Sequence, residues 1–230
     1  MSRARLVLTA AALAALAARS PLRHWGATID ERIRPLPGDG LIPGERDVTT
    51  MAATIHAPPA AIYPWLAQMG FERAGWYSWD RLDRAGIPSD DQLHPEWIHV
   101  AEGDRIVSVP GRTWFEVAHA QPPHSLVLRS LNDLRGRSHD SGGPRPRAFV
   151  DARWEFFLDP QPDGGTRVLV RSGAASAPRL LTRPLDLAFW HPAHVIMQVR
   201  QLQQLRRRAE GLVAFGGAGE VRHEVAAGVR

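Results

Sequence analysis

The chain of 230 residues contains no cysteine and no lysine, and it has only two tyrosines. The absence of cysteine excludes disulfides, thiolate nucleophiles and cysteine-ligated zinc or iron–sulfur centres. The 28 cationic side chains are all arginine, set against 24 carboxylates, and the formal net charge is +4. These arginines are scattered, so we expect no nucleic-acid partner. Their one dense cluster, Arg206–Arg208, ends a predicted helix, where cations are favoured in any case.

The sequence also lacks the common enzyme motifs: G-x-S-x-G, G-x-G-x-x-G, Walker A, H-E-x-x-H and the kinase patterns. We therefore expect no cofactor. One H-x-x-H pair, His191 and His194, has the i, i+3 spacing that can share a metal, but Asp186 is the one obvious further ligand nearby. Metal binding is the weaker interpretation of this pair. His194 as a general base, facing a cavity, is the better one.

Residues 1–20 resemble a signal or membrane-anchor segment. A basic start at Arg3 and Arg5 precedes an apolar run from Leu6 to Ala18. The run is shorter than the ~20 residues of a spanning helix, and its Ala-Leu-Ala pattern is typical of signal cleavage. A cleaved signal, an uncleaved anchor and a peripheral helix all fit. We expect membrane association or export, with a cytoplasmic location as the alternative.

The remaining chain divides into three parts. Residues 21–46 are rich in proline and glycine, which predicts an extended connector. Residues 47–211 have the texture of a single globular domain, and residues 212–230 are predicted to be a flexible tail. Within the domain, two short helices are expected after the first strand: Ala60–Met69, closed by Gly70, and a second one capped by Ser78 that ends at Gly86. Strands are predicted at 48–57, 105–109, 113–121, 125–131, 150–160 and 166–174.

A long amphipathic helix is predicted from His191 onward. Its apolar residues recur at helical spacing and define one face, with glutamine and arginine assigned to the other. The order of elements fits a curved antiparallel sheet whose concave face is covered by this helix. We therefore predict an α+β fold that encloses a cavity. The residues of the apolar face are Val195, Val199, Leu202, Leu205, Ala209 and Leu212.

Five local signals carry a resemblance to a known fold family: Ala57–Gly70, Gly75–Asp83 (GWYSWDRLD), Pro95–Trp97 (PEW), Gly103–Ile106 (GDRI) and Pro192–Glu210. The chain resembles the SRPBCC superfamily, also called START/Bet v 1-like or polyketide-cyclase-like, and within it a bacterial group of unknown function. The resemblance covers most of the chain from Trp25 to Glu210. It implies the helix-grip fold. Since the superfamily includes lipid binders, cyclases, hydroxylase domains and regulators, it implies no single activity.

The stretch from Ile62 to Trp97 holds four of the eight tryptophans and both tyrosines. Such crowding predicts either the end wall of an apolar cavity or an anchor for the short helices. Strand alternation places Trp154 on the side of the long helix and Arg153 on the opposite side. An inward Arg129 would meet an anionic or carbonyl group of a ligand. The residues expected to contact a ligand are Trp76, Tyr77, Trp79, Trp114, Trp154, Phe156, Arg129, Val195 and Val199.

The polar residues form no recognisable catalytic set. Asp80 and Asp83 share a helix face and, with Arg81 and Arg84, are best interpreted as a solvated helix with local ion pairs. Asp80 and His194 are weak catalytic candidates. We expect a protein that binds or transports a hydrophobic small molecule, such as a lipid, isoprenoid or polyketide-like compound. The alternatives are a cyclase/dehydratase-like enzyme that uses a cavity His or Asp, and a non-catalytic interaction domain.

Overall fold

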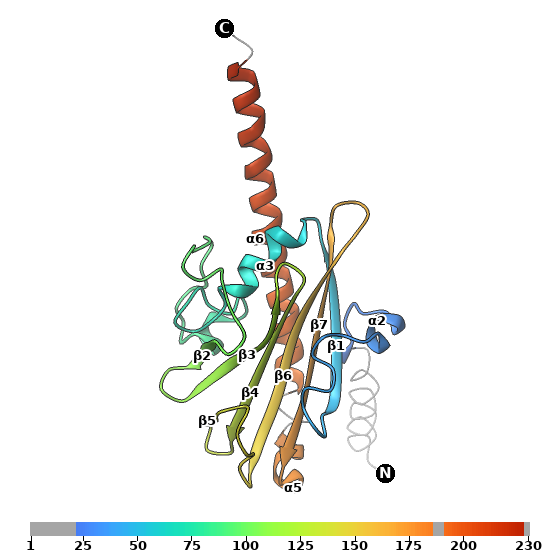
Figure 1. The fold of residues 1–230 in the computed structure, drawn as a ribbon, viewed down its shortest axis with the longest axis vertical. Coiled ribbons are helices and arrows are strands. Elements are labelled where there is room, and N and C mark those ends of the chain that lie inside the picture. The colour runs from blue at the N-terminus through green and yellow to red at the C-terminus, as the bar shows by residue number, and fades with distance from the viewer. Residues whose placement is uncertain (1–21, 186–190, 228–230) are drawn as a thin grey trace, which may run out of the picture.

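A computed structural model describes the backbone of residues 22–185 and 191–227, and the side chains of residues 22–184 and 192–211. One antiparallel sheet, two helices on one of its faces and an N-terminal segment on the other make up the described chain (Figure 1). The elements in chain order are α2 (Ile29–Ile33), β1 (Arg46–Ile55), α3 (Pro59–Ala67), α4 (Asp80–Asp83), β2 (Arg105–Val109), β3 (Thr113–Gln121), β4 (Ser125–Asp133), β5 (Ser138–His139), β6 (Phe149–Pro160), β7 (Thr166–Ala177), α5 (Arg179–Leu185) and α6 (His191–Ala227).

The seven strands are ordered β1-β7-β6-β4-β3-β2, with β5 paired to β4. The longest pairing joins β6 to β7, from Phe149 opposite Ala177 to Pro160 opposite Thr166. Its turn contains the Asp-Gly-Gly sequence, which favours a tight hairpin. The outermost strand β1 is hydrogen-bonded on its free side as well. The amide of Ala52 donates to the Trp25 carbonyl at 3.0 Å, and the amide of Thr50 donates to His24 Nδ1 at 3.2 Å.

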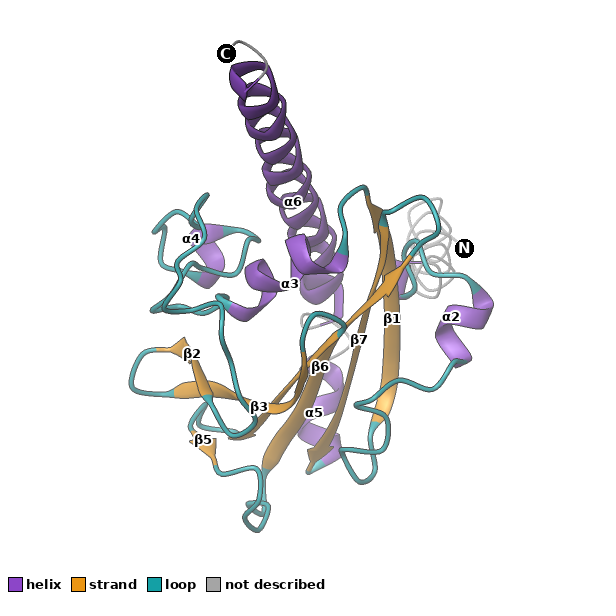
Figure 2. Cartoon of the chain, turned by 45° about the horizontal axis from the view of Figure 1, so that its top comes forward, coloured by secondary structure: helices purple, strands orange, loops and turns teal. Residues whose placement is uncertain are grey.

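The helices α3 and α6 cover one face of the sheet, the inner face (Figure 2). Helix α3 begins at Pro59, where a missing N–H costs least, and it buries Ile62, Trp65 and Leu66. Helix α6 buries Leu202 and Leu205, at helical spacing, against the same core. A long C-terminal helix held in a curved antiparallel sheet is the helix-grip fold, as the sequence predicted.

Three helices differ from their predicted bounds. Helix α3 ends two residues earlier than predicted, at Ala67. Helix α4 spans four residues, and Trp79 occupies its N-cap position without a side-chain hydrogen bond. Ser78, expected to be the cap, instead donates its hydroxyl to the Met197 carbonyl of α6 at 3.3 Å, and so ties the loop to the long helix. Helix α6 continues to Ala227, through residues expected to be a tail. Alanine, glutamate and arginine after its glycines are compatible with a helix.

The segment 22–45 contains most of the expected connector. It passes along the free edge of β1, where Trp25 packs against the core of the inner face, and continues over the opposite face of the sheet, the outer face. Helix α2 begins with a capping box, in which the Thr28 side chain accepts from the Glu31 amide and the Glu31 side chain accepts from the Thr28 amide. Ala27 packs against Leu169 of β7. Gly38 passes so close to the sheet that a Cβ at this position would lie 2.9 Å from Glu155 Oε2. The segment is therefore part of the folded unit.

Buried charges join this segment to the sheet. Arg153 donates through Nε and Nη2 to the Glu45 carboxylate, both at 2.9 Å, and through Nη1 to Asp39 at 3.0 Å and to Glu155 at 2.6 Å. Arg171 donates to Asp39 at 2.8 Å. Burial raises the pKa of Glu155, although the Gly38 amide and Arg153 both favour its charged form. Each buried guanidinium thus has its carboxylate partners.

Candidate functional site

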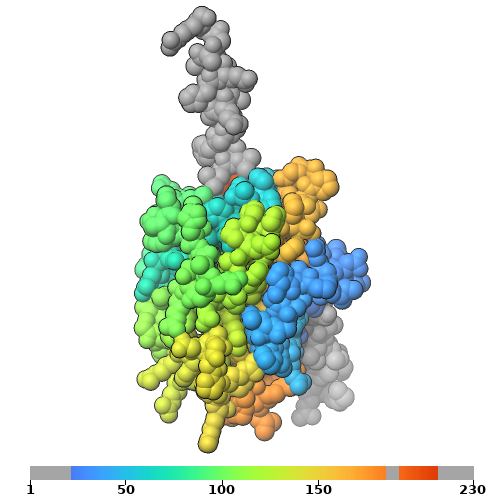
Figure 3. Space-filling view, viewed as in Figure 1, coloured from blue at the N-terminus to red at the C-terminus, as the bar shows by residue number. Residues whose placement is uncertain are grey.

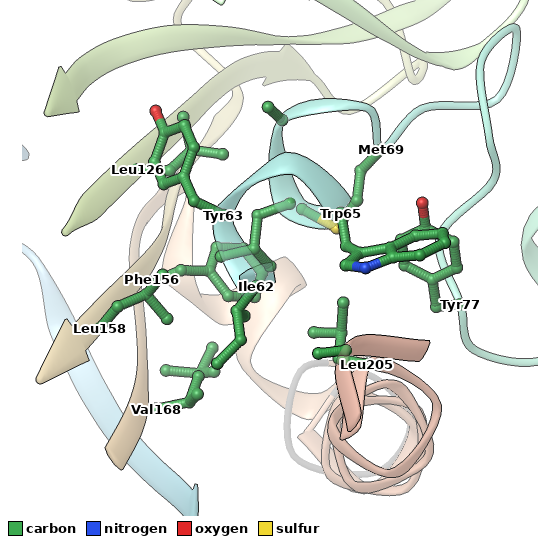
Figure 4. Packing of buried hydrophobic residues seen from close by; sticks show 14 of the residues in the cluster. Ile62, Tyr63, Trp65, Met69, Tyr77, Leu126, Phe156, Leu158, Val168 and Leu205 are labelled. Atoms are coloured by element: carbon green, nitrogen blue, oxygen red, sulfur yellow. The ribbon is translucent and has the colours of Figure 1, made fainter. Parts of the chain in front are cut away.

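At the end of the sheet that α3 covers, side chains fill the space between the inner face and α6. Leu126, Phe156, Leu158 and Val168 are fully buried there, beside Leu205 of α6 (Figure 4). Any cavity that admits water would give its lining side chains some accessible surface, and these side chains have none. This part of the molecule is therefore close-packed core, and we call it the closed half.

Toward the other end, the inner-face positions change to small side chains. Ser130, Ala152 and Ala174 lie side by side on β4, β6 and β7, and Ser172 follows on β7. All except Ser130 are partly exposed. Such side chains are too short to span the roughly 10 Å between packed layers. The hydroxyl oxygen of Ser172 is buried and has no hydrogen-bond partner among the described residues. We call this region, Ser130, Ala152, Ser172, Ala174 and Ser176, the open half.

An aromatic cluster separates the two halves. Trp154 lies at its centre, with ring centroids 4.9 Å from Phe156, 5.7 Å from Phe115 and 5.8 Å from Trp76. Phe115 and Trp76 meet edge to face at 5.6 Å. Trp154 is partly exposed and points from β6 toward α6. The cluster therefore forms an apolar floor beneath the open half.

Two glutamines of α6 fix this floor. Trp154 Nε1 donates to Gln198 Oε1 at 2.9 Å, Gln198 Nε2 donates to Gln201 Oε1 at 2.8 Å, and Gln201 Nε2 donates to the Trp76 carbonyl at 2.8 Å. Gln198 and Gln201 are 2% and 1% exposed, so the assignment of glutamine to the outward face was wrong for both. Their positions signalled this, since Gln198 follows buried Val195 by three residues and Gln201 precedes buried Leu205 by four.

The structure brings three predicted ligand-contacting residues together, since Trp76, Trp154 and Phe156 meet in the floor. Val195 is buried on α6, one turn before Gln198. Val199 is half-buried on the same helix.

Tyr77 is buried in the closed half against Trp65. Its hydroxyl accepts a hydrogen bond from Gln68 Nε2 at 2.8 Å, and burial raises its pKa above the usual range. We interpret Tyr77 as a structural residue.

Three other predicted contacts lie away from the floor. Arg129 is on the outer face, where Nε and Nη2 donate to the buried Asp151 carboxylate at 2.9 and 2.8 Å. Trp114 is on the same face, and the Arg105 guanidinium lies 4.7 Å from its ring centroid. Trp79 is 47% exposed and lines a surface hollow of about 500 Å³ between α4 and α6. A ligand in the open half would not reach them.

The two carboxylates of α4 have different surroundings: Asp80 holds local structure, whereas Asp83 lacks a described partner. Asp80 Oδ1 accepts from the Ser89 amide at 3.1 Å and hydroxyl at 2.6 Å. Arg84 donates to the carbonyls of Phe71 at 3.0 Å and Pro88 at 2.7 Å. The local ion pairs expected for this helix therefore do not form among the described side chains. Asp83 has two buried carboxylate oxygens without a partner there, and burial, together with Asp80, raises its pKa to about 6.

We predict that Asp83→Asn stabilises the protein at pH 8 but not at pH 4. The usual pKa of 3.8 is raised to about 6 in the fold, so folding favours the neutral acid. The resulting penalty is absent below the usual pKa, grows between pH 4 and 6, and is complete above. Allowing for solvent screening, we expect a gain on the order of 1 kcal/mol at pH 8. Urea unfolding at both pH values measures it. The exposed Asp30→Asn should give no such gain, and an equal gain at pH 4 and pH 8 contradicts the ionisation origin.

His194 is half-buried on α6, one turn before Gln198. The side chain of its predicted partner His191 lies outside the described residues. Among those that are described, no group of three or more His, Asp or Glu side chains is placed to hold a metal. The predicted anchor at residues 1–20 likewise lies outside the described part of the chain, within which no helix is both long and apolar enough to cross a membrane.

Charge separates the two faces of the sheet. The buried charged residues of the described chain are Asp151, Arg153, Glu155 and Arg171, and strand pairing places all four on the outer face of β6 and β7. On the inner face, the buried polar groups of the floor are neutral amides.

Neither a family model nor a curated protein matches the chain. Similar solved structures include CalU16 from Micromonospora echinospora, with 16% identity over 74% of this chain and 93% of that one and a TM-score of 0.31. The hypothetical protein jhp0584 from Helicobacter pylori has 11% identity, coverages of 77% and 95%, and a TM-score of 0.47. PFC0360w, an HSP90 activator from Plasmodium falciparum, has 12% identity, coverages of 66% and 96%, and a TM-score of 0.35. Because the identities and TM-scores are this low, no function can be inferred for this chain from these structures.

Proposed function

We propose that the protein binds a neutral, hydrophobic small molecule of lipid, isoprenoid or polyketide-like character in the open half of the inner face. The observation that carries the proposal is the change of side-chain size along that face. Leucine, phenylalanine and valine fill the closed half, whereas serine and alanine occupy most of the equivalent positions beyond the aromatic floor of Trp154, with Asn132 and Val150 as the exceptions. The helix-grip fold and the sequence resemblance also lead us to propose membership of the SRPBCC superfamily.

The chemistry of the open half supports binding over catalysis. An apolar ligand resting on Trp154 and Phe115 would gain about 25 cal/mol per Å² of buried apolar surface, before association costs. The Ser172 hydroxyl is buried and lacks a described partner, so a rotation of its side chain would be needed before it could donate to a carbonyl or hydroxyl group of a ligand. The buried carboxylates, Asp151 and Glu155, lie on the opposite face, so among the catalytic candidates only His194 of α6 is on the helix that covers the inner face.

We predict that Ala152→Phe weakens ligand binding about tenfold or more. Ala152 is the middle residue of the open half, between Ser130 and Ala174 on the inner face of the sheet. A benzyl group at this position would occupy the space proposed for the ligand. Titration of the full chain with N-phenyl-1-naphthylamine, a neutral and apolar fluorescent probe, should show saturable binding that this substitution weakens about tenfold or more. Native mass spectrometry of the purified chain should also show a bound small molecule that is missing from Ala152→Phe.

The control is Ala101→Phe, which adds the same group at an exposed loop position and should bind the probe like the native chain. Equal circular dichroism and unfolding midpoints show that both variants fold. Undiminished binding by a folded Ala152→Phe would place the ligand elsewhere. A native chain with no saturable binding and no co-purified molecule would refute the proposed function.

A further inference from the structure

Helix α5 presents an apolar surface to solvent at the end of the sheet beyond the open half. Leu180 and Leu181 are 92% and 68% exposed, while Thr182 is buried and its hydroxyl lies 2.8 Å from that of Ser176 on β7. The helix is thus fixed to the sheet through Thr182 and turns two adjacent leucines outward. Single exposed leucines are ordinary, but adjacent ones rimmed by polar residues mark an interaction surface.

Exposed arginines lie at the same end of the molecule as these leucines. Arg179 and Arg183 belong to α5 itself, and Arg135, Arg137 and Arg147 come from the loops on either side of β5. Figures 1 and 3 place α5 and these loops at the same end of the molecule.

The carboxylates at this end already have partners. Asp140 pairs with Arg105, and Asp151 pairs with Arg129 and Arg145. Asp133 accepts from the amides of residues 135 and 137 and contacts the His139 ring. Arg183 itself pairs with Asp47. Among the described residues no carboxylate pairs with Arg135, Arg137, Arg147 or Arg179, so this end of the molecule carries a net positive charge.

The beginning of the described chain lies beside α5. Arg23 and Arg183 both contact the Asp47 side chain, at 3.7 and 2.9 Å, and the neighbouring Leu22 is exposed. The sequence before Leu22 contains the apolar run from Leu6 to Ala18. The described chain therefore begins close to α5. A preceding segment that reached a bilayer would bring α5 near the bilayer as well.

We propose that this end of the molecule, with α5 at its centre, docks onto a lipid bilayer that carries anionic headgroups. Leu180 and Leu181 would enter the boundary between headgroups and acyl chains, and the surrounding arginines would contact lipid phosphates. The open half lies at the same end, so a ligand could exchange with the bilayer over a short path. The docking proposal does not depend on the ligand, because a chain with an empty open half could dock in the same way.

A site-specific label tests the docking. Because the chain has no cysteine, Leu180→Cys creates a unique thiol for the environment-sensitive fluorophore NBD. We expect its emission to rise several-fold and shift to the blue when the full chain meets vesicles of phosphatidylcholine and phosphatidylglycerol. The response should be weaker with phosphatidylcholine alone and should fall with salt. The matched control is Leu82→Cys, at an exposed leucine of α4, which should not respond.

A second variant distinguishes the contribution of α5 to vesicle binding from that of the N-terminal segment. Leu180→Glu/Leu181→Glu changes only exposed positions, so its circular dichroism should match that of the native chain, and we expect several-fold less of it to pellet with anionic vesicles. A silent label at residue 180, or equal responses at residues 180 and 82, would overturn the proposal. So would a concentration-dependent dimer, seen by light scattering, that the double variant abolishes, since the leucines would then contact a second copy.

Discussion

Replacing Arg153 with methionine is expected to lower the free energy of unfolding by about 3–5 kcal/mol. The Arg153 side chain is almost completely buried and holds Glu155, Glu45 and Asp39 around it. Methionine fills much of the volume but leaves three carboxylates without this partner, and Glu155 is itself buried. Urea unfolding at pH 7.5 measures the loss. The loss should shrink at acidic pH, because protonation relieves the unpaired carboxylates.

The matched control removes an exposed arginine from an ion pair. Arg206 pairs with Glu210 across one helical turn at 2.9 Å, and about half of its side chain is exposed. Arg206→Met should therefore cost about 0.5 kcal/mol or less. Adding Glu155→Gln to Arg153→Met should recover part of the stability, because one buried charge disappears. A cost below about 1 kcal/mol for Arg153→Met would show that the outer-face network contributes little to stability.

Trp65→Ala is expected to cost about 3–5 kcal/mol, since it leaves a large cavity in the closed half. Trp65 is buried in α3, with its ring 6.0 Å from that of Tyr77 in an edge-to-face contact. Trp65→Phe should cost much less, because phenylalanine keeps most of the packing and removes an indole N–H that is buried without a described partner. Urea unfolding measures both changes. Equal costs for the two substitutions would contradict this account of the closed half.

Patterns that span a few residues allowed much of the fold to be predicted from the sequence. The bounds of β2 and β3 match the prediction, because Pro110-Gly111 and the pair Pro122-Pro123 mark the turns that end them. Alternation along β6 correctly placed Trp154 toward α6 and Arg153 on the opposite face. These features depend on local geometry alone.

Features that depend on long-range contacts were missed. The face that Trp114 and Arg129 occupy is set by the pairing of β2, β3, β4 and β6, including a register shift between Val117 and His119, which no local pattern reveals. The buried positions of Gln198 and Gln201 depend on the indole and carbonyl groups that meet them. The polar segment before β1 packs on the sheet because Asp39 and Glu45 form ion pairs with buried arginines of β6 and β7.

The hydrogen bonds on the free side of β1 have a consequence for solubility. An uncovered outermost strand can pair with the same strand of another molecule, which leads to polymerisation and aggregation. Here the Trp25 carbonyl and the His24 ring accept two amides of β1, and Glu210 of α6 accepts the amide of His56 at 3.0 Å. The segment that looks like a linker in the sequence thus keeps neighbouring molecules apart, and an expression design that begins after Gly26 would expose a template for fibre growth.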